Sequence, residues 1–149
     1  MTTARLLTER PLVEFNDEGL RVLKRELAVD LGCHIVELHE WGGTCVSTSP
    51  DGTTMLIVPS GFVYNGASIP SLLLLHSVMG DRELYEAAGV FHDFLYREQA
   101  PRSTSDFVFW LIARSGSKQV TPARGWFGWA GLRIGGWIAY RARGREAAA

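Results

Sequence analysis

The chain has few cysteines, only Cys33 and Cys45 among 149 residues. Two cysteines do not indicate the dense disulfide framework of small secreted domains, although one bridge between them stays open. They do not form a C-x-x-C pair, so the sequence does not predict a structural zinc site. The glycine-rich motifs that bind phosphates or dinucleotides are missing as well, which argues against nucleotide chemistry.

A long apolar run is also missing. The most apolar stretch, WFGWAGLRIGGWIAY at residues 126–140, is interrupted by Arg133. It is shorter than the roughly 20 residues that a membrane-spanning helix needs. The first residues, MTTARLLTERP, lack the apolar core of a secretory signal. We therefore expect no transmembrane segment and a chain that is made and folded in a cytoplasm.

Carboxylates are absent between Asp106 and Glu146, so the charge is unevenly distributed. Residues 1–106 carry 15 acidic and 8 basic side chains, whereas residues 107–149 carry 7 basic and 1 acidic. One interpretation is that the two parts attract each other within one fold. The other is that the basic part meets a phosphate, an anionic lipid or an acidic protein partner. A basic tail alone does not predict nucleic-acid binding, and we expect none.

The length predicts a single domain, residues 1–149, of the α+β class. Its β-rich part, residues 1–66, contains short apolar runs that read as strands, such as residues 34–40. The pair Asp51-Gly52 lies between two such runs and predicts a hairpin. Residues 20–29 fit a strand and a short helix equally well, so their periodicity leaves that segment open.

Residues 67–149 are predicted to be helical, with about three packed helices. Ser68 and Pro70 are typical of a helix start. Residues 82–96 carry apolar side chains at helical spacing. Hydroxyl residues before position 105 predict a further helix over 105–114, and Pro122 opens a final helix that reaches about residue 143.

The final predicted helix has one face of small residues beside a stripe of aromatic ones. Glycine in a helix costs about 1 kcal/mol relative to alanine, so a row of glycines suggests that another backbone approaches closely. That neighbour is either another part of the same chain or an assembly partner, since aromatic residues and arginine are enriched at interfaces. The candidate interface residues are Gly128, Gly131, Gly135, Trp126, Trp129, Trp137 and Arg133.

Three motifs stand in order along the chain: VPSGFVYNGASIP (58–70), AAGVFHDFLYR (87–97) and RSTSDFVFWLI (102–112). Together they resemble a small family found mainly in phages and prophages, domain of unknown function 1353. The resemblance implies a genomic setting more than a chemistry. Asn65 stands where that family usually has Asp, which weakens a catalytic or metal role for the position but suits a turn.

The second and third motifs also resemble the HDxxY…D core of the secreted and parvoviral phospholipases. That resemblance implies that His92 is a general base, Asp93 a calcium ligand and Tyr96 a supporting residue. It also implies that Asp106 orients the histidine. In those enzymes a glycine-rich loop completes the calcium site, and the only candidate for it here is NGAS at residues 65–68.

Two other interpretations of this cluster stay open. A metal phosphohydrolase would use His76 together with His92, Asp93 and Asp106 as ligands. A purely structural cluster would instead have Asp106 accept from His92 across two antiparallel helices, with the Tyr96 hydroxyl reaching the NGAS turn. In that case Asp93 pairs with Arg97 or Arg102.

The sequence thus leads to a phage- or prophage-encoded, virion-associated structural or assembly protein without catalytic activity or cofactor, in a tail or neck. We expect it in the virion, and in the host cytoplasm during assembly. Its partners would be other virion proteins, in a homo- or hetero-oligomer. The alternative is a calcium-dependent lipid or ester hydrolase that touches the membrane surface of the host envelope.

Overall fold

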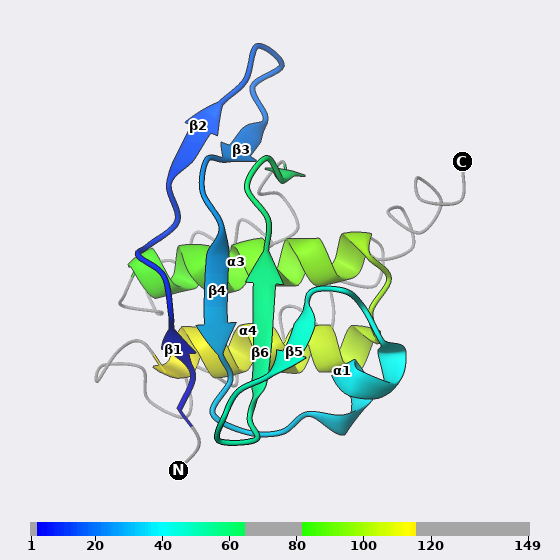
Figure 1. Cartoon of the computed structure of the whole chain (residues 1–149). Helices are drawn as coiled ribbons and strands as arrows, with labels where there is room; N and C mark the ends of the chain where they lie inside the picture. Colours follow the sequence, from blue (N-terminus) through cyan, green and yellow to red (C-terminus); the bar gives the residue numbers. More distant parts are fainter. Residues whose placement is uncertain (1–2, 65–81, 116–149) are drawn as a thin grey trace.

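The computed structural model describes residues 3–64 and 82–115 of the chain. Two small antiparallel sheets come first and two long helices follow, which confirms the predicted α+β class (Figure 1). The sheet with strand order β1-β4-β6-β5 covers one side of the helix pair, and the sheet β2-β3-β7 extends beyond its end. The helices predicted to start near residues 68 and 122 lie outside the described residues.

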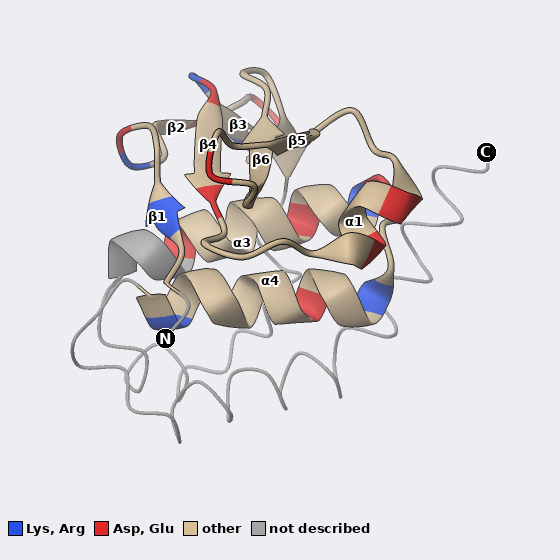
Figure 2. Cartoon of the chain, turned by 60° about the horizontal axis from the view of Figure 1, so that its bottom comes forward, with Lys and Arg blue, Asp and Glu red and all other residues tan. Residues whose placement is uncertain are grey.

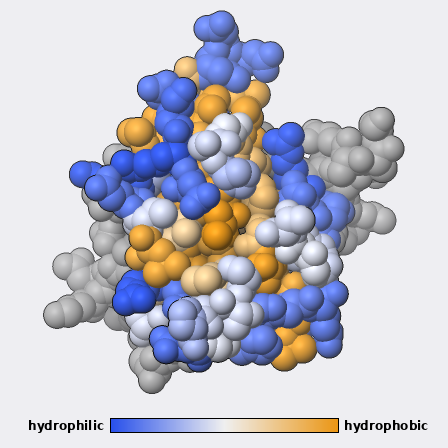
Figure 3. All heavy atoms as spheres, viewed as in Figure 1, coloured by the Kyte–Doolittle hydropathy of each residue, from blue (hydrophilic) through white to orange (hydrophobic). Residues whose placement is uncertain are grey.

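The larger sheet is built from β1 (Arg5–Leu6), β4 (Leu27–Asp30), β5 (Val46–Thr48) and β6 (Thr54–Val58). The side chains of β6 alternate: Leu56 and Val58 are buried, and Met55 and Ile57 are half-buried. The outer face of this sheet carries both apolar and polar residues (Figure 3). The predicted hairpin joins β5 to β6, and Gly52 has the positive φ of 82° that such a turn needs.

The smaller sheet contains β2 (Val13–Phe15), β3 (Arg21–Leu23) and β7 (Val63–Tyr64). The Asn16 side chain closes the β2–β3 turn by accepting from the N–H groups of Glu18 and Leu20, at 3.0 and 2.9 Å. The segment 20–29, which periodicity left open, forms two strands, one in each sheet. The residues between Leu23, in β3, and Leu27, in β4, lead from the smaller sheet to the larger one. Both leucines are buried.

The prediction of a strand over residues 34–40 is wrong, because helix α1 (Val36–Trp41) lies there. Ile35 and Leu38, three residues apart, are the buried positions, and that spacing suits one face of a helix. Gly42 then takes a left-handed conformation, with φ 74°, and its N–H donates to the Leu38 carbonyl. This glycine cap ends the helix.

The helices α3 (Arg82–Arg97) and α4 (Arg102–Ser115) are joined by a tight turn. Gln99 takes a positive φ of 58°, and its N–H donates to the Tyr96 carbonyl, while the Ala100 N–H donates to the Leu95 carbonyl. This pair of bonds is the Schellman arrangement that reverses a chain after a helix. The prediction for α3 is confirmed to within one residue. Helix α4 begins three residues earlier than predicted, and Ser105 lies inside its first turn.

The apolar core fills the space between the larger sheet and the helix pair. Its side chains come from both layers and include Leu27, Val29, Leu56, Val58, Phe91, Leu95, Val108 and Ile112. Cys33 and Cys45 are free thiols. Burial raises the pKa of the Cys45 thiol to about 11, so it stays protonated at neutral pH and is a poor nucleophile. Within the described ranges, no helix has the length and apolarity needed to cross a membrane.

Candidate functional site

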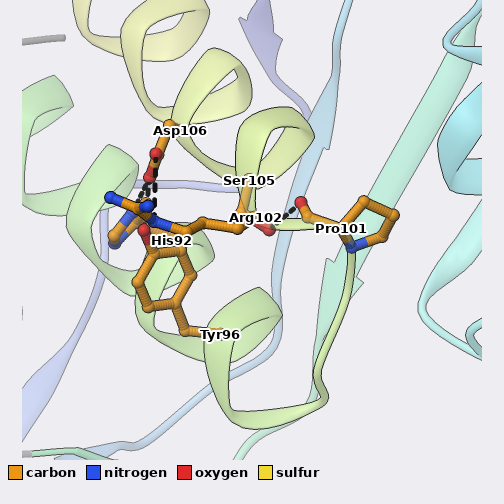
Figure 4. A network of polar contacts seen from close by, with 6 residues as sticks. All are labelled: His92, Tyr96, Pro101, Arg102, Ser105 and Asp106. Carbon is orange, nitrogen blue, oxygen red and sulfur yellow. Dashed lines mark hydrogen bonds and ion pairs between the residues drawn. The ribbon is translucent and has the colours of Figure 1, made fainter. Parts of the chain in front are cut away.

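Three polar side chains meet in the buried seam between α3 and α4 (Figure 4). His92 and Tyr96 stand one turn apart on α3, and Asp106 faces them from the first half of α4. His92 Nε2 lies 2.9 Å from Asp106 Oδ1, and the Tyr96 hydroxyl donates to the same oxygen at 2.5 Å. All three residues have an exposed fraction of 0%. The tight turn after α3 makes this meeting possible, because it runs α4 back along α3.

The carboxylate determines which nitrogen of His92 carries the proton. An ionised carboxylate only accepts hydrogen bonds, so the Nε2 that faces Asp106 is the donor. In the neutral imidazole the lone pair is therefore on Nδ1. Nδ1 is buried and has no hydrogen-bond partner among the residues that the structure describes. The ring itself is fixed by Tyr96, with centroids 4.0 Å apart, and by the Phe109 ring at 5.7 Å.

Tyr96 supports the carboxylate of Asp106. The expected contact of its hydroxyl with NGAS involves residues 65–68, which lie outside the described residues; within the described residues the hydroxyl donates its hydrogen bond to Asp106. Burial, followed by the hydrogen bond and charge of Asp106, raises the pKa of Tyr96 far above its ordinary value. The phenol therefore remains a donor across the physiological range, and it keeps one lone pair of Asp106 Oδ1 occupied.

The two arginines that were predicted to support the site have different positions. Arg102, the first residue of α4, has its Nε 3.9 Å from Asp106 Oδ2, and its side chain is 18% exposed. Along α4 the acidic residue lies between basic residues near the two ends of the helix (Figure 2). Arg97 instead donates to the Val63 carbonyl at 3.0 Å and ties α3 to β7.

Asp93 is also buried, with 1% of its surface exposed, and it follows His92 directly on α3. Consecutive helical residues point about 100° apart, so Asp93 faces a different side of the helix from His92. Tyr64 lies near Asp93. Burial raises the pKa of Tyr64 to about 12. The positive charge of Arg21 lowers this pKa, and the negative charges of Glu86 and Asp93 raise it. Strand β7 ends at Tyr64, the residue before the NGAS segment in the sequence.

The described residues do not form a calcium site by themselves. No group of three or more His, Cys, Asp or Glu side chains in residues 3–64 and 82–115 is arranged to hold a metal. Asp93, the calcium ligand that the resemblance implies, is among the described residues, whereas Asn65 lies outside them. The same holds for His76 and for every candidate interface residue in the final predicted helix.

Sequence reasoning missed two neighbours of the site. Phe109 packs its ring against His92, and Tyr64 approaches Asp93 from the smaller sheet. Phe109 lies three residues after Asp106 on α4, so the helical period could have placed it on the same side. No local signal places Tyr64, because its approach depends on how the sheet packs against α3.

Comparison with known proteins gives one result. The family model described as a protein of unknown function, DUF1353, matches residues 44–132, which is more than half of the chain. This span includes His92, Tyr96, Arg102 and Asp106. No curated protein and no solved structure matches the chain. The chain therefore belongs to the DUF1353 family.

Proposed function

We propose that the chain is a hydrolase of carboxylic esters, with lipids as its substrate class, in which His92 is the general base. One observation carries the proposal. His92 is held by a buried carboxylate through Nε2, while Nδ1 is directed away from that carboxylate and has no hydrogen-bond partner in the described part of the chain. A histidine fixed in this way is prepared to take a proton from water.

The chemistry follows from the three side chains. Nδ1 of His92 accepts a proton from a water molecule as the water oxygen attacks the ester carbonyl carbon. The imidazolium that forms is stabilised by Asp106 through the 2.9 Å contact. The imidazolium then returns the proton to the leaving alkoxide, so that an acid and an alcohol are produced. Tyr96 holds the carboxylate and does not itself transfer a proton.

Calcium is part of the resemblance to phospholipases, and Asp93 is the described residue that would ligate it. Because the described residues include no group of three or more possible ligands, no catalytic step is derived through the ion. Calcium dependence is a separate prediction of the proposal. It is tested by comparing hydrolysis in buffer that contains calcium with hydrolysis in buffer that contains a chelator.

The test measures hydrolysis of fluorogenic acyl esters and of phospholipid vesicles by the full-length chain. We expect His92→Asn to lower the rate constant by roughly 10²–10⁴-fold, the range that general-base catalysis contributes. Asp106→Asn should lower it strongly as well, because an amide can present its N–H₂ to Nε2 and so favour the wrong tautomer. Tyr96→Phe should cost less, because Asp106 keeps its bond to His92.

A matched control separates catalysis from folding. His34→Asn changes an exposed histidine of the β-rich part and should leave hydrolysis unchanged. Each variant is also compared with the parent chain by circular dichroism and thermal unfolding. If the parent chain hydrolyses none of these esters with or without calcium, the hydrolase proposal is wrong. The same conclusion follows if a folded His92→Asn variant keeps full activity.

A second candidate function is a non-catalytic structural or assembly protein of a virion, in a tail or neck. It is favoured by the same seam, because His92, Tyr96 and Asp106 share hydrogen bonds at zero exposure. Buried polar groups that satisfy one another fix the register of two helices, and a structural role requires nothing more. The motif resemblance to phage and prophage proteins suggests the setting, with other virion proteins as partners.

Purified particles test this candidate. If the chain is a virion component, quantitative mass spectrometry should find it in washed particles at a constant ratio to the major structural proteins. A chain that is absent from the particles, or that washes off, would contradict this role. The two candidates also differ in Asp106→Asn, since a structural seam predicts lost stability and a hydrolase predicts lost activity in the fraction that remains folded.

A further inference from the structure

Arg102, the first residue of α4, reaches from the start of this helix into the buried seam (Figure 4). Its Nε lies 3.9 Å from Oδ2 of Asp106, and its side chain is 18% exposed. The two residues are four positions apart, which places them on one face of the helix, one turn from each other. The guanidinium therefore lies beside a fully buried carboxylate rather than in solvent.

The first turn of α4 is anchored twice at its start. The Ser105 N–H donates to the Pro101 carbonyl at 2.9 Å, and the Ser105 hydroxyl donates to the same carbonyl at 3.0 Å. Ser105 is itself fully buried, and it directly precedes Asp106. Because both bonds lie within the turn that carries Arg102 and Asp106, they fix the backbone positions from which these two side chains meet.

The two oxygens of the Asp106 carboxylate have different neighbours. Oδ1 accepts from His92 Nε2 at 2.9 Å and from the Tyr96 hydroxyl at 2.5 Å, while Oδ2 faces the arginine. Arg102 also bonds to the Tyr96 hydroxyl. Burial and then Asp106 raise the pKa of Tyr96, whereas the hydrogen bond and the positive charge of Arg102 lower it. One cation thus holds both the carboxylate and the phenol that bonds to it.

The charge of this arginine matters because Asp106 and His92 are both fully buried. A buried carboxylate costs a large free energy unless a cation balances its charge. His92 does not supply that charge while it serves as a base, because a general base is neutral before it accepts a proton. A guanidinium is charged throughout the physiological pH range, so Arg102 balances Asp106 while the imidazole stays neutral.

We propose that Arg102 is a positioning residue, which orients Asp106 so that the carboxylate keeps His92 in the tautomer with its proton on Nε2. The arginine transfers no proton and acts through Asp106. The effect on the reaction rate rests on the hydrolase proposed above. The effect on the hydrogen bond between His92 and Asp106 does not, because that bond is measured without a substrate.

Three substitutions separate the charge of Arg102 from its packing, with ester hydrolysis by the full-length chain as the readout. Arg102→Gln and Arg102→Met both remove the charge, and the methionine keeps an apolar stem. We expect both to lower kcat by about 10–100-fold, the usual cost of removing a group that orients a functional histidine. KM should change little, because the interaction serves the reacting state rather than substrate binding. Arg102→Lys keeps the charge without the planar fork, so it should recover part of the loss.

Nuclear magnetic resonance follows the His92–Asp106 bond directly. In chains with isotope-labelled histidine, the Nε2 proton of His92 should give a resolved, slowly exchanging signal, which is identified by its loss in His92→Asn. At the same pH this signal should broaden or disappear in Arg102→Gln and Arg102→Met, because a carboxylate that is no longer held lets the proton exchange with water. In Arg102→Lys the signal should remain, with faster exchange than in the parent chain.

Arg114→Gln is the matched control for these variants. Arg114 is half-buried on the same helix, and its guanidinium lies over the Trp110 ring, 4.7 Å from the ring centroid. This variant should keep both the parent kcat and the His92 signal.

The outcomes separate this proposal from the hydrolase itself. A folded Arg102→Gln chain with the parent kcat and the parent signal would overturn the positioning role and leave the hydrolase standing. Parent values in Arg102→Met would also overturn it, since packing of the stem would then be sufficient. If neither variant folds, Arg102→Lys decides, and parent values in both measurements would count against the proposal. A parent chain without activity overturns the hydrolase, whereas a signal lost in Arg102→Gln still supports the orientation of Asp106 by Arg102.

Discussion

The helix pair and the sheet edge differ in where they keep polar and apolar groups. The seam between α3 and α4 buries a histidine, a tyrosine and an aspartate that bind one another. The edge of β1 and β2 does the opposite and exposes leucine and phenylalanine to solvent. Polar groups inside and apolar groups outside both cost stability unless they are partnered. The seam has its partners within the chain, whereas the described residues leave the apolar side chains of the edge largely uncovered.

The largest expected loss of stability is in the seam. Asp106→Ala removes the shared acceptor and leaves the His92 N–H and the Tyr96 hydroxyl buried without it. We expect the free energy of unfolding to fall by about 3–5 kcal/mol, the typical cost of breaking a buried polar pair on one side. Urea unfolding followed by tryptophan fluorescence measures it.

The matched control for Asp106→Ala is Asp17→Ala, in the exposed turn between β2 and β3. It should change the free energy of unfolding by less than about 0.5 kcal/mol. If Asp106→Ala unfolds at the same urea concentration as the parent chain, the seam does not hold the two helices together. The contrast with the sheet edge would then be lost.

A smaller loss is expected inside the larger sheet, where the two faces of β6 can be compared. Leu56 is 1% exposed and faces the helices, so Leu56→Ala should cost about 2–5 kcal/mol through lost burial and a new cavity. Ile57, its neighbour, is half-buried on the outer face. Ile57→Ala should therefore cost clearly less. Equal losses in the two variants would show that the outer face is as closely packed as the core.

The seam and the sheets also differ in how much of each could be predicted from the sequence. The α3–α4 seam was predicted down to the His92–Asp106 bond, because helical spacing and a short linker fix which side chains can meet. The strand expected over residues 34–40 was wrong, since β-branched residues outweighed the spacing of Ile35 and Leu38. The proximity of Tyr64 and Asp93 could not be predicted, because it depends on how two separate layers pack.

Alkaline pH should weaken the contact between the smaller sheet and α3. Burial raises the pKa of Tyr64 from 10.0 to about 12. Its contribution to stability is fully present below pH 10, the value for the unfolded chain, and is lost as the pH rises toward 12. Unfolding measured at pH 9, 10 and 11 should show this decline. Tyr64→Phe should show less of it, and an equal decline in both chains would contradict the assignment.

The smallest expected effect is at the sheet edge. Leu12 is 49% exposed, so Leu12→Ser removes less packing than a change at a buried position. The variant and the parent chain should unfold within about 0.5 kcal/mol of each other in urea. A loss as large as that of Asp106→Ala would mean that Leu12 serves the fold as a buried residue does, and the edge would then resemble the seam in having its partners within the molecule.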